Sequence, residues 1–465
     1  MEPVETTSAP LVNPASDRPR WNYAPGRLRK LIGNRDALKS LMSLFDQGLV
    51  SGTNFLTMVI IGRTCLAEEL GVFHLLMTII LMSFLFQDAL TSAPYRIYLQ
   101  KKNPEDRLAY TGSLFVHQLF VCGLVMALLI GLYLASLAGF LMESIQEPLI
   151  PLFGLIPFIL TREFLRRVSF AHLQFEYAIL IDALVSSLQL TTLIILAFQH
   201  QLTVSIAYIV IGCACLISVC LWFFLNPVER TYIFKLVKPH WMENWSFGRW
   251  SVGSLMVANM PGVLLLPWML ALKEGEQSIG ILAACFTIIG VANVFLNGVE
   301  NLLGPRSAHA LHTGGKSELK QVISRATVMM TISISLFSLM LILAGKIIAL
   351  TLYGDDYAEF GNLMGWIISI LSLHVLAGAI GMAPGNGLWA LERPNDNFYA
   401  SFMVMIVTFL ISIVLVYVVE LGPLGIAIGT ASGTAAGTVL RWVFFARAYA
   451  KAPAVLEHPE PVLAS

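Results

Sequence analysis

A few ionisable side chains interrupt the long apolar runs of this 465-residue sequence, and they are the residues best placed to do chemistry. Asp88 and Glu300 each lie near one end of such a run. A charged side chain that faces hydrocarbon costs ~2.5–3.5 kcal/mol on insertion scales, so each of them marks a candidate site. They could line the mouth of a pathway and exchange a proton or cation there. Alternatively, they could pair with Arg96, Arg249 or Arg306 as a conformational latch, and the sequence leaves both interpretations open.

Four asparagines inside apolar runs form a second group of candidates, at Asn54, Asn259, Asn293 and Asn297. Asn293 and Asn297 are one helical turn apart and would share a face. In a water-filled cavity their amides could hydrogen-bond the hydroxyls of a polar ligand. The alternative is that they join neighbouring helices, through bonds worth roughly 0.6–2 kcal/mol each.

Arg63 ends the first apolar run, and its guanidinium could either bind a phosphate group or extend to the membrane surface. His117 and His374 stand alone among apolar residues, which favours packed, neutral imidazoles. Cys213 and Cys215 have neither zinc-like nor redox spacing. We therefore expect no metal site, no catalytic residue and no resident cofactor.

The elements that must hold these residues are membrane helices. The sequence is 57% hydrophobic and only 12% charged, with a mean hydropathy of +0.74, whereas soluble domains average about 25% charged residues. Apolar runs of about 20 residues recur along the chain, long enough to cross a hydrocarbon core of ~30 Å. Lipid offers backbone groups no hydrogen-bond partners, so each run must be a helix. The twelve predicted spans are 41–62, 70–93, 111–138, 148–166, 177–198, 203–225, 250–272, 278–303, 326–345, 361–390, 398–420 and 423–446.

Basic residues set the expected orientation of these spans. Of the 29 lysines and arginines, all except Arg63, Lys273 and Lys346 fall on the side that holds both termini. The positive-inside rule therefore places both termini in the cytosol.

An internal repeat links the two halves of the sequence. The hairpin Leu41–Arg96 has a weaker copy over 250–306, roughly 205 residues later. In this alignment Gly280 takes the place of Gly71. A hairpin that recurs half a chain later is typical of transporters built from two similar halves.

Two further patterns concern helix geometry. Pro261-Gly262 interrupts the seventh span, and such a break either lets the helix bend during a cycle or leaves a static kink. Glycines recur every fourth residue on the last span, so one face of that helix can pack closely on a neighbour. They are Gly425, Gly429, Gly433 and Gly437.

Six short motifs occur in a fixed order along these spans. They are Asp46-Gln-Gly with Ser51-Gly-Thr-Asn54-Phe, Arg63 to Gly71-Val-Phe, Arg162-Glu163-Phe-Leu-Arg-Arg167, Leu352-Tyr-Gly354-Asp-Asp-Tyr357, Ala390-Leu-Glu-Arg-Pro394 and Gly422-Pro-Leu-Gly425. By these motifs the chain resembles, over 40–448, the bacterial polysaccharide or O-antigen flippases. These belong to the multidrug/oligosaccharidyl-lipid/polysaccharide (MOP) exporter superfamily.

The resemblance implies an all-α fold of about twelve transmembrane helices in two six-helix bundles related by the pseudo-twofold repeat. A central cavity would open to each side of the membrane in turn. The implied cargo is a polyprenyl-diphosphate-linked oligosaccharide, moved from the inner to the outer leaflet of the bacterial inner (plasma) membrane for export of a cell-surface or extracellular polysaccharide. Arg96, Arg249 and Arg306 are then candidates for first contact with the diphosphate, and Arg63 for contact after crossing.

No cofactor is implied, and any driving force is expected from a proton or sodium gradient. The expected partners are the lipid bilayer, the lipid-linked glycan and other polysaccharide-assembly proteins, and no nucleic acid. The expected organisation is a disordered cytosolic tail, a six-helix bundle, an interfacial linker, a second six-helix bundle and a second cytosolic tail. In order, these segments are 1–40, 41–225, 226–249, 250–448 and 449–465.

Other functions remain open at this stage. A cation-coupled multidrug or small-molecule exporter of the same superfamily is expected to hold a carboxylate deep in its first span, and Asp46 lies too near the cytosolic end for that. A membrane glycosyltransferase, ligase or polymerase needs longer outer loops than this chain has. A peptidoglycan-precursor flippase would carry more spans and several arginines in its cavity. Here Arg162, Arg166 and Arg167 are assigned to a cytosolic loop and Arg441 to the segment after the last span, which also disfavours an acidic glycan as cargo.

Overall fold

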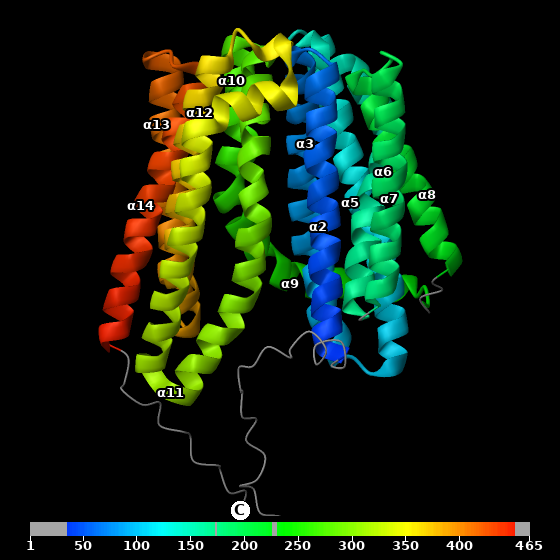
Figure 1. Ribbon diagram of the computed structural model, residues 1–465. Coiled ribbons are helices and arrows are strands. Elements are labelled where there is room, and N and C mark those ends of the chain that lie inside the picture. The colour runs from blue at the N-terminus through cyan, green and yellow to red at the C-terminus, as the bar shows by residue number, and fades with distance from the viewer. Residues whose placement is uncertain (1–34, 173, 226–229, 452–465) are drawn as a thin grey trace, which may run out of the picture.

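Every regular element in the computed structural model is a helix over the residues it describes, which are 35–172, 174–225 and 230–451 (Figure 1). The all-α class expected from the composition is therefore confirmed. The helices are α2 Arg35–Thr64, α3 Ala67–Gln87, α4 Ala93–Tyr98, α5 Pro104–Leu137, α6 Gln146–Ala171, α7 Phe175–Phe198, α8 Val204–Leu225, α9 Phe234–Asn259, α10 Leu266–Glu274, α11 Glu276–Tyr353, α12 Gly361–Ala390, α13 Pro394–Ile413 and α14 Gly422–Lys451.

Short π-helical turns join or extend some of these helices. In such turns one extra residue widens the helix, and they are common where a helix bends or carries a site. The turn η1 Asp88–Ser92 joins α3 to α4, and η4 Met260–Leu265 joins α9 to α10. The turn η6 Val414–Val418 extends α13.

The number of membrane crossings agrees with the sequence-based prediction. Nine of the described helices are long and apolar enough to cross a membrane, and the bent pair Ser251–Val257 and Met260–Glu274 adds a tenth. One of the nine, α11, breaks at Gly315, where φ is 64° and ψ is −162°, and folds back to give two crossings (Figure 1). α2 packs along α7. It has 30 residues, which is ~45 Å of helix and long enough to cross a membrane. With α11 counted as two crossings and α2, which is not among the nine, added by its length, the described helices give the twelve expected.

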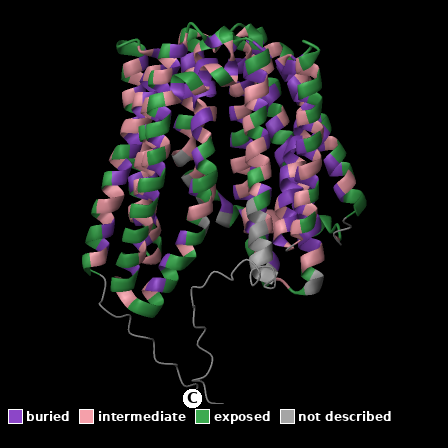
Figure 2. Ribbon diagram, viewed as in Figure 1, coloured by how far each residue is buried: buried purple, intermediate pink, exposed green. Residues whose placement is uncertain are grey.

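The crossings form two bundles that stand side by side (Figure 1). In the first, α2 to α8, α2 packs on α7 and α6 packs on α8; in the second, α9 to α14, α11 packs on α12 and α13 on α14. α11 links the bundles because it also packs against α2 and α3. Figure 2 shows exposed residues along the outer sides of both bundles. Large apolar side chains such as Leu119, Leu336 and Leu343 are exposed, as is expected where helices meet lipid.

Both described ends of the chain lie at one face of the molecule, where α2 begins and α14 ends (Figure 1). The fold-back of α11 at Gly315 lies at this face, and α10 lies at the other. We name these the terminal face and the opposite face. The predicted tails 1–40 and 449–465 lie largely outside the described residues, and their described parts belong to α2 and α14.

α9 runs from the predicted linker 226–249 into the seventh span as one continuous helix. Its first half is attached to α5 of the first bundle. Tyr110 donates its hydroxyl hydrogen to Oδ1 of Asn244 at 2.7 Å. The Nε2–H of the buried His117 is donated to the carbonyl oxygen of Val237 at 2.9 Å. The connection between the bundles is therefore fastened to the first of them.

The break predicted at Pro261-Gly262 is confirmed. The helix axis bends by 51° between Ser251–Val257 and Met260–Glu274. The π-helical turn η4 contains the proline, whose missing N–H prevents a regular helical hydrogen bond. The seventh crossing is therefore a broken helix, unlike α2, its counterpart in the repeat.

The glycine repeat of α14 faces α13, and the predicted close packing is confirmed. A Cβ atom on Gly433 would lie 2.7 Å from the carbonyl oxygen of Val404, and one on Gly429 would lie 2.8 Å from the backbone nitrogen of Ser412. Only hydrogen fits between two backbones at such distances.

We expect Gly433→Ala to destabilise the protein, because the added methyl group collides with the backbone of α13. Gly290→Ala on α11 is the matched control, since its Cβ would meet nothing within 4 Å. At that position the higher helix propensity of alanine, worth ~1 kcal/mol, acts alone. The thermal unfolding midpoint in detergent should fall for Gly433→Ala and hold or rise for Gly290→Ala, and equal midpoints would contradict the packing.

Candidate functional site

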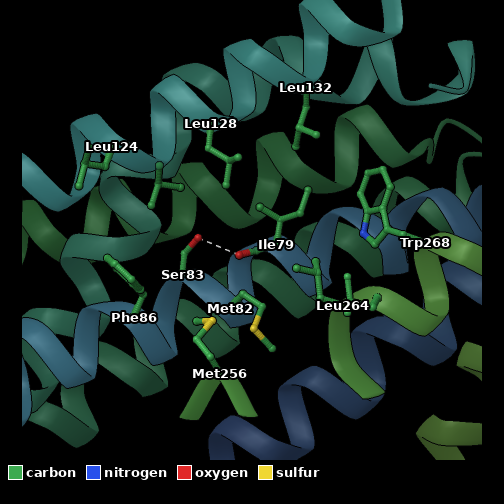
Figure 3. A pocket seen from close by; sticks show the side chains of 12 residues that line it. Ile79, Met82, Ser83, Phe86, Leu124, Leu128, Leu132, Met256, Leu264 and Trp268 are labelled. Atoms are coloured by element: carbon green, nitrogen blue, oxygen red, sulfur yellow. Dashed lines mark hydrogen bonds between the residues drawn. The ribbon is translucent and has the colours of Figure 1, made fainter. Parts of the chain in front are cut away.

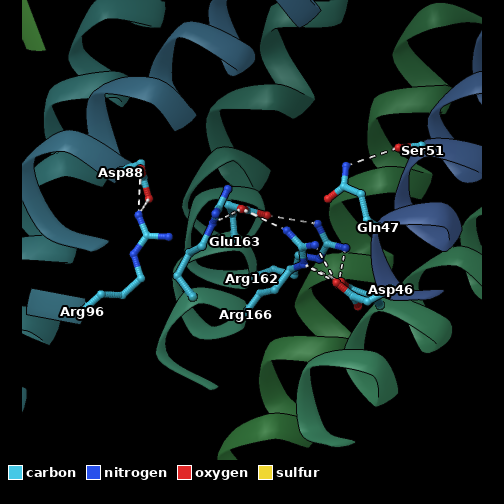
Figure 4. A network of polar contacts seen from close by, with 10 residues as sticks. Asp46, Gln47, Ser51, Asp88, Arg96, Arg162, Glu163 and Arg166 are labelled. Atoms are coloured by element: carbon cyan, nitrogen blue, oxygen red, sulfur yellow. Dashed lines mark hydrogen bonds and ion pairs between the residues drawn. The ribbon is translucent and has the colours of Figure 1, made fainter. Parts of the chain in front are cut away.

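A cluster of ion pairs lies inside the first bundle, where α2, α6 and α7 meet (Figure 4). Arg166 of α6 donates from Nη2 and Nε to Oδ2 of Asp46 at 2.6 and 3.1 Å. Its Nε also lies 2.7 Å from Oδ2 of Asp182 of α7, and Arg162 of α6 bonds the other oxygen of that carboxylate. The side chains of Asp46 and Asp182 are fully buried, and that of Arg166 is 7% exposed.

Glu163 completes the cluster from α6 itself. It accepts hydrogen bonds from Nη1 of Arg166 at 3.4 Å and from Nε of Arg167 at 2.8 Å, and it lies 3.6 Å from Nη1 of Arg162. Three arginines are thus matched by three carboxylates. Removing one member of a buried pair costs ~3–5 kcal/mol, so these contacts fasten three helices together. No group of three or more His, Cys, Asp and Glu side chains suited to a metal ion occurs in the described part of the chain.

The position of this cluster corrects the sequence-based assignment of its arginines. The assignment of Arg162, Arg166 and Arg167 to a cytosolic loop is wrong, because α6 continues to Ala171 as part of a membrane-crossing helix. Basic residues near the end of a span satisfy the positive-inside rule whether they lie in a loop or in the last helical turns. Asp46 is the missed signal, since a carboxylate inside a span requires a buried partner.

A cavity of about 270 Å³ lies beside the cluster in the first bundle, with polar groups on one side and a larger apolar lining that includes Phe73, Met77 and Phe84 of α3. Amides and hydroxyls of α2 and α7 line it together with the arginines. They are Gln47, Thr53, Asn54, Thr57, Ser186 and Gln189. Thr53 donates to Ser186 Oγ, and Gln189 Nε2 donates to Thr57 Oγ1, each at 2.7 Å. These bonds join α2 to α7. Asn54 is exposed and also lines the cavity.

The other predicted asparagines lie elsewhere. Asn259 donates from Nδ2 to the carbonyl oxygen of Leu255 at 3.0 Å, one turn earlier in α9. Asn293 and Asn297 are exposed on the first arm of α11. The structure therefore brings only Asn54 of the four to the cavity of the first bundle.

Asp88 forms an ion pair with Arg96, one of the partners that the latch interpretation names (Figure 4). Nη2 of Arg96 lies 3.3 Å from both oxygens of Asp88. The side chains are 41% and 29% exposed, and an exposed pair contributes at most ~1 kcal/mol.

The remaining charged candidates lie on helices α9 and α11 of the second bundle. Arg249 and Arg306 are exposed on α9 and α11. Glu300 lines a pocket together with Arg441 of α14. The sequence-based placement of Arg441 after the last span is wrong: Arg441 falls inside the predicted span 423–446, and α14 continues beyond it to Lys451.

An apolar pocket of about 490 Å³ lies between the bundles, on another side of α3 (Figure 3). Ile79 of α3 and Leu128 of α5 line it from the first bundle, and Met256 of α9 and Trp268 of α10 line it from the second. Ser83 donates its hydroxyl to the carbonyl oxygen of Ile79 at 2.8 Å, so this hydroxyl is already used (Figure 3). The pocket suits a hydrocarbon chain and offers little for polar recognition.

At the opposite face the bundles meet through the two glycines that the repeat alignment pairs. A Cβ atom on Gly71 would lie 2.8 Å from the carbonyl carbon of Glu276, and one on Gly280 would lie 2.7 Å from the carbonyl carbon of Ala67. Each glycine faces the carbonyl of the residue one turn before its counterpart. The contact therefore has the twofold symmetry expected of the repeat, and α3 and α11 touch only because both positions lack a side chain.

Arg63 spans the same junction. Its Nη1 donates to the carbonyl oxygens of Thr351 and Leu352, at 2.7 and 3.4 Å, at the C-terminal end of α11. The last carbonyls of a helix lack intrahelical donors and carry partial negative charge, so a guanidinium binds them well. The candidate for phosphate contact is thus engaged by the protein backbone in this conformation.

Replacing Arg166 should lower the free energy of unfolding strongly. In Arg166→Met the buried Asp46 and Asp182 lose a shared partner, which should cost about 3–5 kcal/mol. The double variant Asp46→Asn/Arg166→Met also removes the carboxylate of Asp46, which Arg166→Met alone leaves without a partner. Asp182 still pairs with Arg162, so the double variant should recover part of the lost free energy of unfolding. Arg96→Met, which breaks an exposed pair, is the control and should lose less than ~1 kcal/mol. Unfolding in detergent measures all three, and a double variant no more stable than Arg166→Met would contradict the cluster.

Several solved structures share this architecture. An inward-facing multidrug resistance MATE family transporter of the MOP superfamily aligns over 87% of this chain and 94% of its own, with a TM-score of 0.73 and 13% identity. The lipid II flippase MurJ in an inward closed conformation aligns over 89% of each chain, with a TM-score of 0.70 and 15% identity. An outward-facing multidrug resistance MATE family transporter aligns over 90% of this chain and 97% of its own, with a TM-score of 0.64 and 13% identity. No protein-family model and no curated protein matches the sequence. The chain has the fold of the MOP superfamily transporters.

Proposed function

We propose that this protein is a flippase for a polyprenyl-diphosphate-linked oligosaccharide. It moves this cargo by alternating access from the inner to the outer leaflet of the bacterial plasma membrane, for export of a cell-surface or extracellular polysaccharide. The terminal face is then the cytosolic face, as the distribution of basic residues favours. The shared fold supports transport, and the sequence motifs favour this cargo class.

The observation that carries the proposal is the pairing, on two sides of α3, of a cavity that has polar groups on one side with a pocket that is almost entirely apolar. The cavity presents Asn54, Gln47 and hydroxyl groups, which can give and accept the hydrogen bonds of sugar hydroxyls. The pocket presents leucines, methionines and Trp268, which can hold an isoprenoid chain. A lipid-linked oligosaccharide has one polar and one apolar part and needs both surfaces.

The ion-pair cluster favours an uncharged glycan over a cationic cargo. Asp46, Glu163 and Asp182 all pair with arginines, so this cluster keeps no free carboxylate to attract a cation. The three arginines are engaged as well, so the cavity beside them is not strongly cationic. Hydrogen bonding between neutral groups is the recognition that remains, and it suits sugar hydroxyls.

Closure at the opposite face supports alternating access. Gly71 and Gly280 let α3 and α11 touch there, and Arg63 ties α2 to the end of α11. The fold is also more similar to the inward-facing transporter than to the outward-facing one. During a cycle these contacts open while the terminal face closes, so the junction acts as the outer gate.

The energy source belongs to the same proposal. A proton or sodium gradient drives the cycle, and Asp88 and Glu300 are the carboxylates placed to respond to it. Other polysaccharide-assembly proteins supply the cargo on one side and consume it on the other.

A second candidate function is cation-coupled export of drugs or other small molecules. The apolar pocket between the bundles favours it, because a hydrophobic drug would fit the same wall as a lipid chain. The pairing of Asp46 with Arg166 weighs against it, since a cationic drug requires a free carboxylate.

Deleting the gene should abolish the surface polysaccharide and leave the polyprenyl-linked glycan on the cytosolic leaflet. Extraction of lipid-linked oligosaccharides measures accumulation, and a lectin added to intact spheroplasts measures how much glycan faces outward. Normal export without accumulation would refute the flippase. Normal export together with raised drug sensitivity would favour the exporter.

Gly71→Leu should abolish complementation of such a deletion strain, because a side chain at this position keeps α3 and α11 apart and the outer gate open. Gly123→Leu on α5 is the control, since that glycine is exposed and its Cβ would meet nothing within 4 Å. Membrane abundance of both variants should match the parent. Full complementation by Gly71→Leu would contradict the assignment of this junction as a gate.

A further inference from the structure

A second polar pocket, of about 180 Å³, lies in the second bundle. Four helices contribute to it: Glu300 comes from α11, Asn386 and Trp389 from α12, Asn397 from α13 and Arg441 from α14. It is separate from the cavity of the first bundle, and the ion-pair cluster does not reach it.

Glycines of α12 create the space for this pocket. Gly378, Gly381 and Gly385 are three and four residues apart and therefore lie on one helical face, lining the pocket. A Cβ atom on Gly385 would lie 3.4 Å from Oδ1 of Asn397 and 3.7 Å from Cδ of Arg441. A methyl group there fits without collision and narrows the pocket.

Arg441 is held by neutral partners. Its Nε donates to Oδ1 of Asn397 at 3.2 Å, and its Nη2 donates to Oγ of Ser401 at 3.3 Å. Glu300 lines the same pocket and attracts Arg441 through space, without an ion pair within 4.0 Å. The guanidinium is thus oriented and keeps Nη1 without a hydrogen bond among the described residues.

Donors and acceptors both remain available around this guanidinium, as far as the described residues show. Asn386 donates Nδ2 to the carbonyl oxygen of Met382 at 3.1 Å, which leaves its Oδ1 as an acceptor. Asn397 uses Oδ1 for Arg441, which leaves its Nδ2 as a donor. The exposed carboxylate of Glu300 is a further acceptor, and the indole of Trp389, 59% exposed, adds a donor and a flat apolar face.

The ion-pair cluster of the first bundle also contains arginines, but there each guanidinium is paired with carboxylates. There Arg166 contacts carboxylates from three helices, whereas Arg441 contacts an amide and a hydroxyl. By helix order within each bundle, α12 holds the place of α6. Arginines of α6 form the ion-pair cluster, whereas glycines of α12 line an open pocket.

We propose that this pocket binds one neutral sugar unit of the transported glycan. A sugar hydroxyl both donates and accepts, so it can bridge the mixed donors and acceptors, and the apolar face of a pyranose ring can rest on Trp389. The formal charges of Glu300 and Arg441 cancel, so the pocket has no net charge to favour a phosphate or uronate group over a neutral sugar. The assignment rests on the proposed flippase function and adds a sugar-binding subsite to it.

Saturation-transfer NMR on the full chain in nanodiscs tests the subsite. The probes are glucose and N-acetylglucosamine, with glucuronate and inorganic diphosphate as anionic probes. Gly385→Ala fills the pocket and Arg441→Gln removes its charge, and Gly290→Ala is the control with open space at its Cβ. We expect a neutral sugar to bind the parent and the control, and to bind both pocket variants about tenfold more weakly, which is a change of ~1.4 kcal/mol. Equal unfolding midpoints show that the variants are folded.

Three results would overturn the subsite: no neutral sugar binds, binding is unchanged in both pocket variants, or diphosphate binds more tightly than the sugars and Glu300→Gln strengthens it. The deletion strain keeps this test apart from that of the function. If sugar binding depends on the pocket but the deletion strain exports polysaccharide normally, the sugar subsite is supported and the flippase function is refuted. If the deletion strain loses export but no sugar binds at the pocket of Arg441, the flippase function is supported and the subsite is refuted.

Discussion

One guanidinium, that of Arg166, holds the first bundle together. It contacts carboxylates on α2, α6 and α7, in a part of the molecule where the side chains of Asp46 and Asp182 have no access to solvent. A charge at low dielectric must find its counter-charge locally, so the three helices can be arranged only in ways that keep these contacts. The polar cavity lies directly beside the cluster because the same helices form its wall. The shape of the cavity therefore follows from the ion pairs.

The two halves are symmetric where they meet and asymmetric where they hold polar groups. Gly71 and Gly280 face each other's helices in the same way, so α3 and α11 can move about a common contact. Inside the bundles Arg166 is saturated by carboxylates, whereas Arg441 is held by an amide and a hydroxyl beside an open pocket. Symmetric motion requires matched contacts at the junction. The cargo proposed above has unlike parts and requires surfaces that differ; the cavity of the first bundle and the apolar pocket between the bundles differ in this way.

The fold could be predicted from the sequence because hydrocarbon permits little besides helices, and apolar length counts the crossings directly. The glycine repeat of α14 and the break at Pro261-Gly262 could also be predicted, because each is a feature of a single helix. The site was harder. Sequence gives the depth of a residue along a helix, but it does not give the neighbour that the residue faces. Arg162 and Arg441 therefore looked like loop residues, and Asn259, which bonds its own helix, looked like a cavity residue.

Charge balance in both bundles bears on how a flippase releases its cargo. A diphosphate held by several unpaired arginines would bind too tightly to leave, because charge-assisted hydrogen bonds are roughly twice as strong as neutral ones. Sugar hydroxyls held by amides and by already engaged guanidinium groups exchange with water at a net ~1 kcal/mol each. The exposed arginines Arg96, Arg249 and Arg306 can meet a diphosphate at the membrane surface, where solvent screens the attraction. In the proposed flippase, neutral contacts to the glycan inside and screened contacts to the diphosphate outside would allow the same carrier to load at one face and empty at the other.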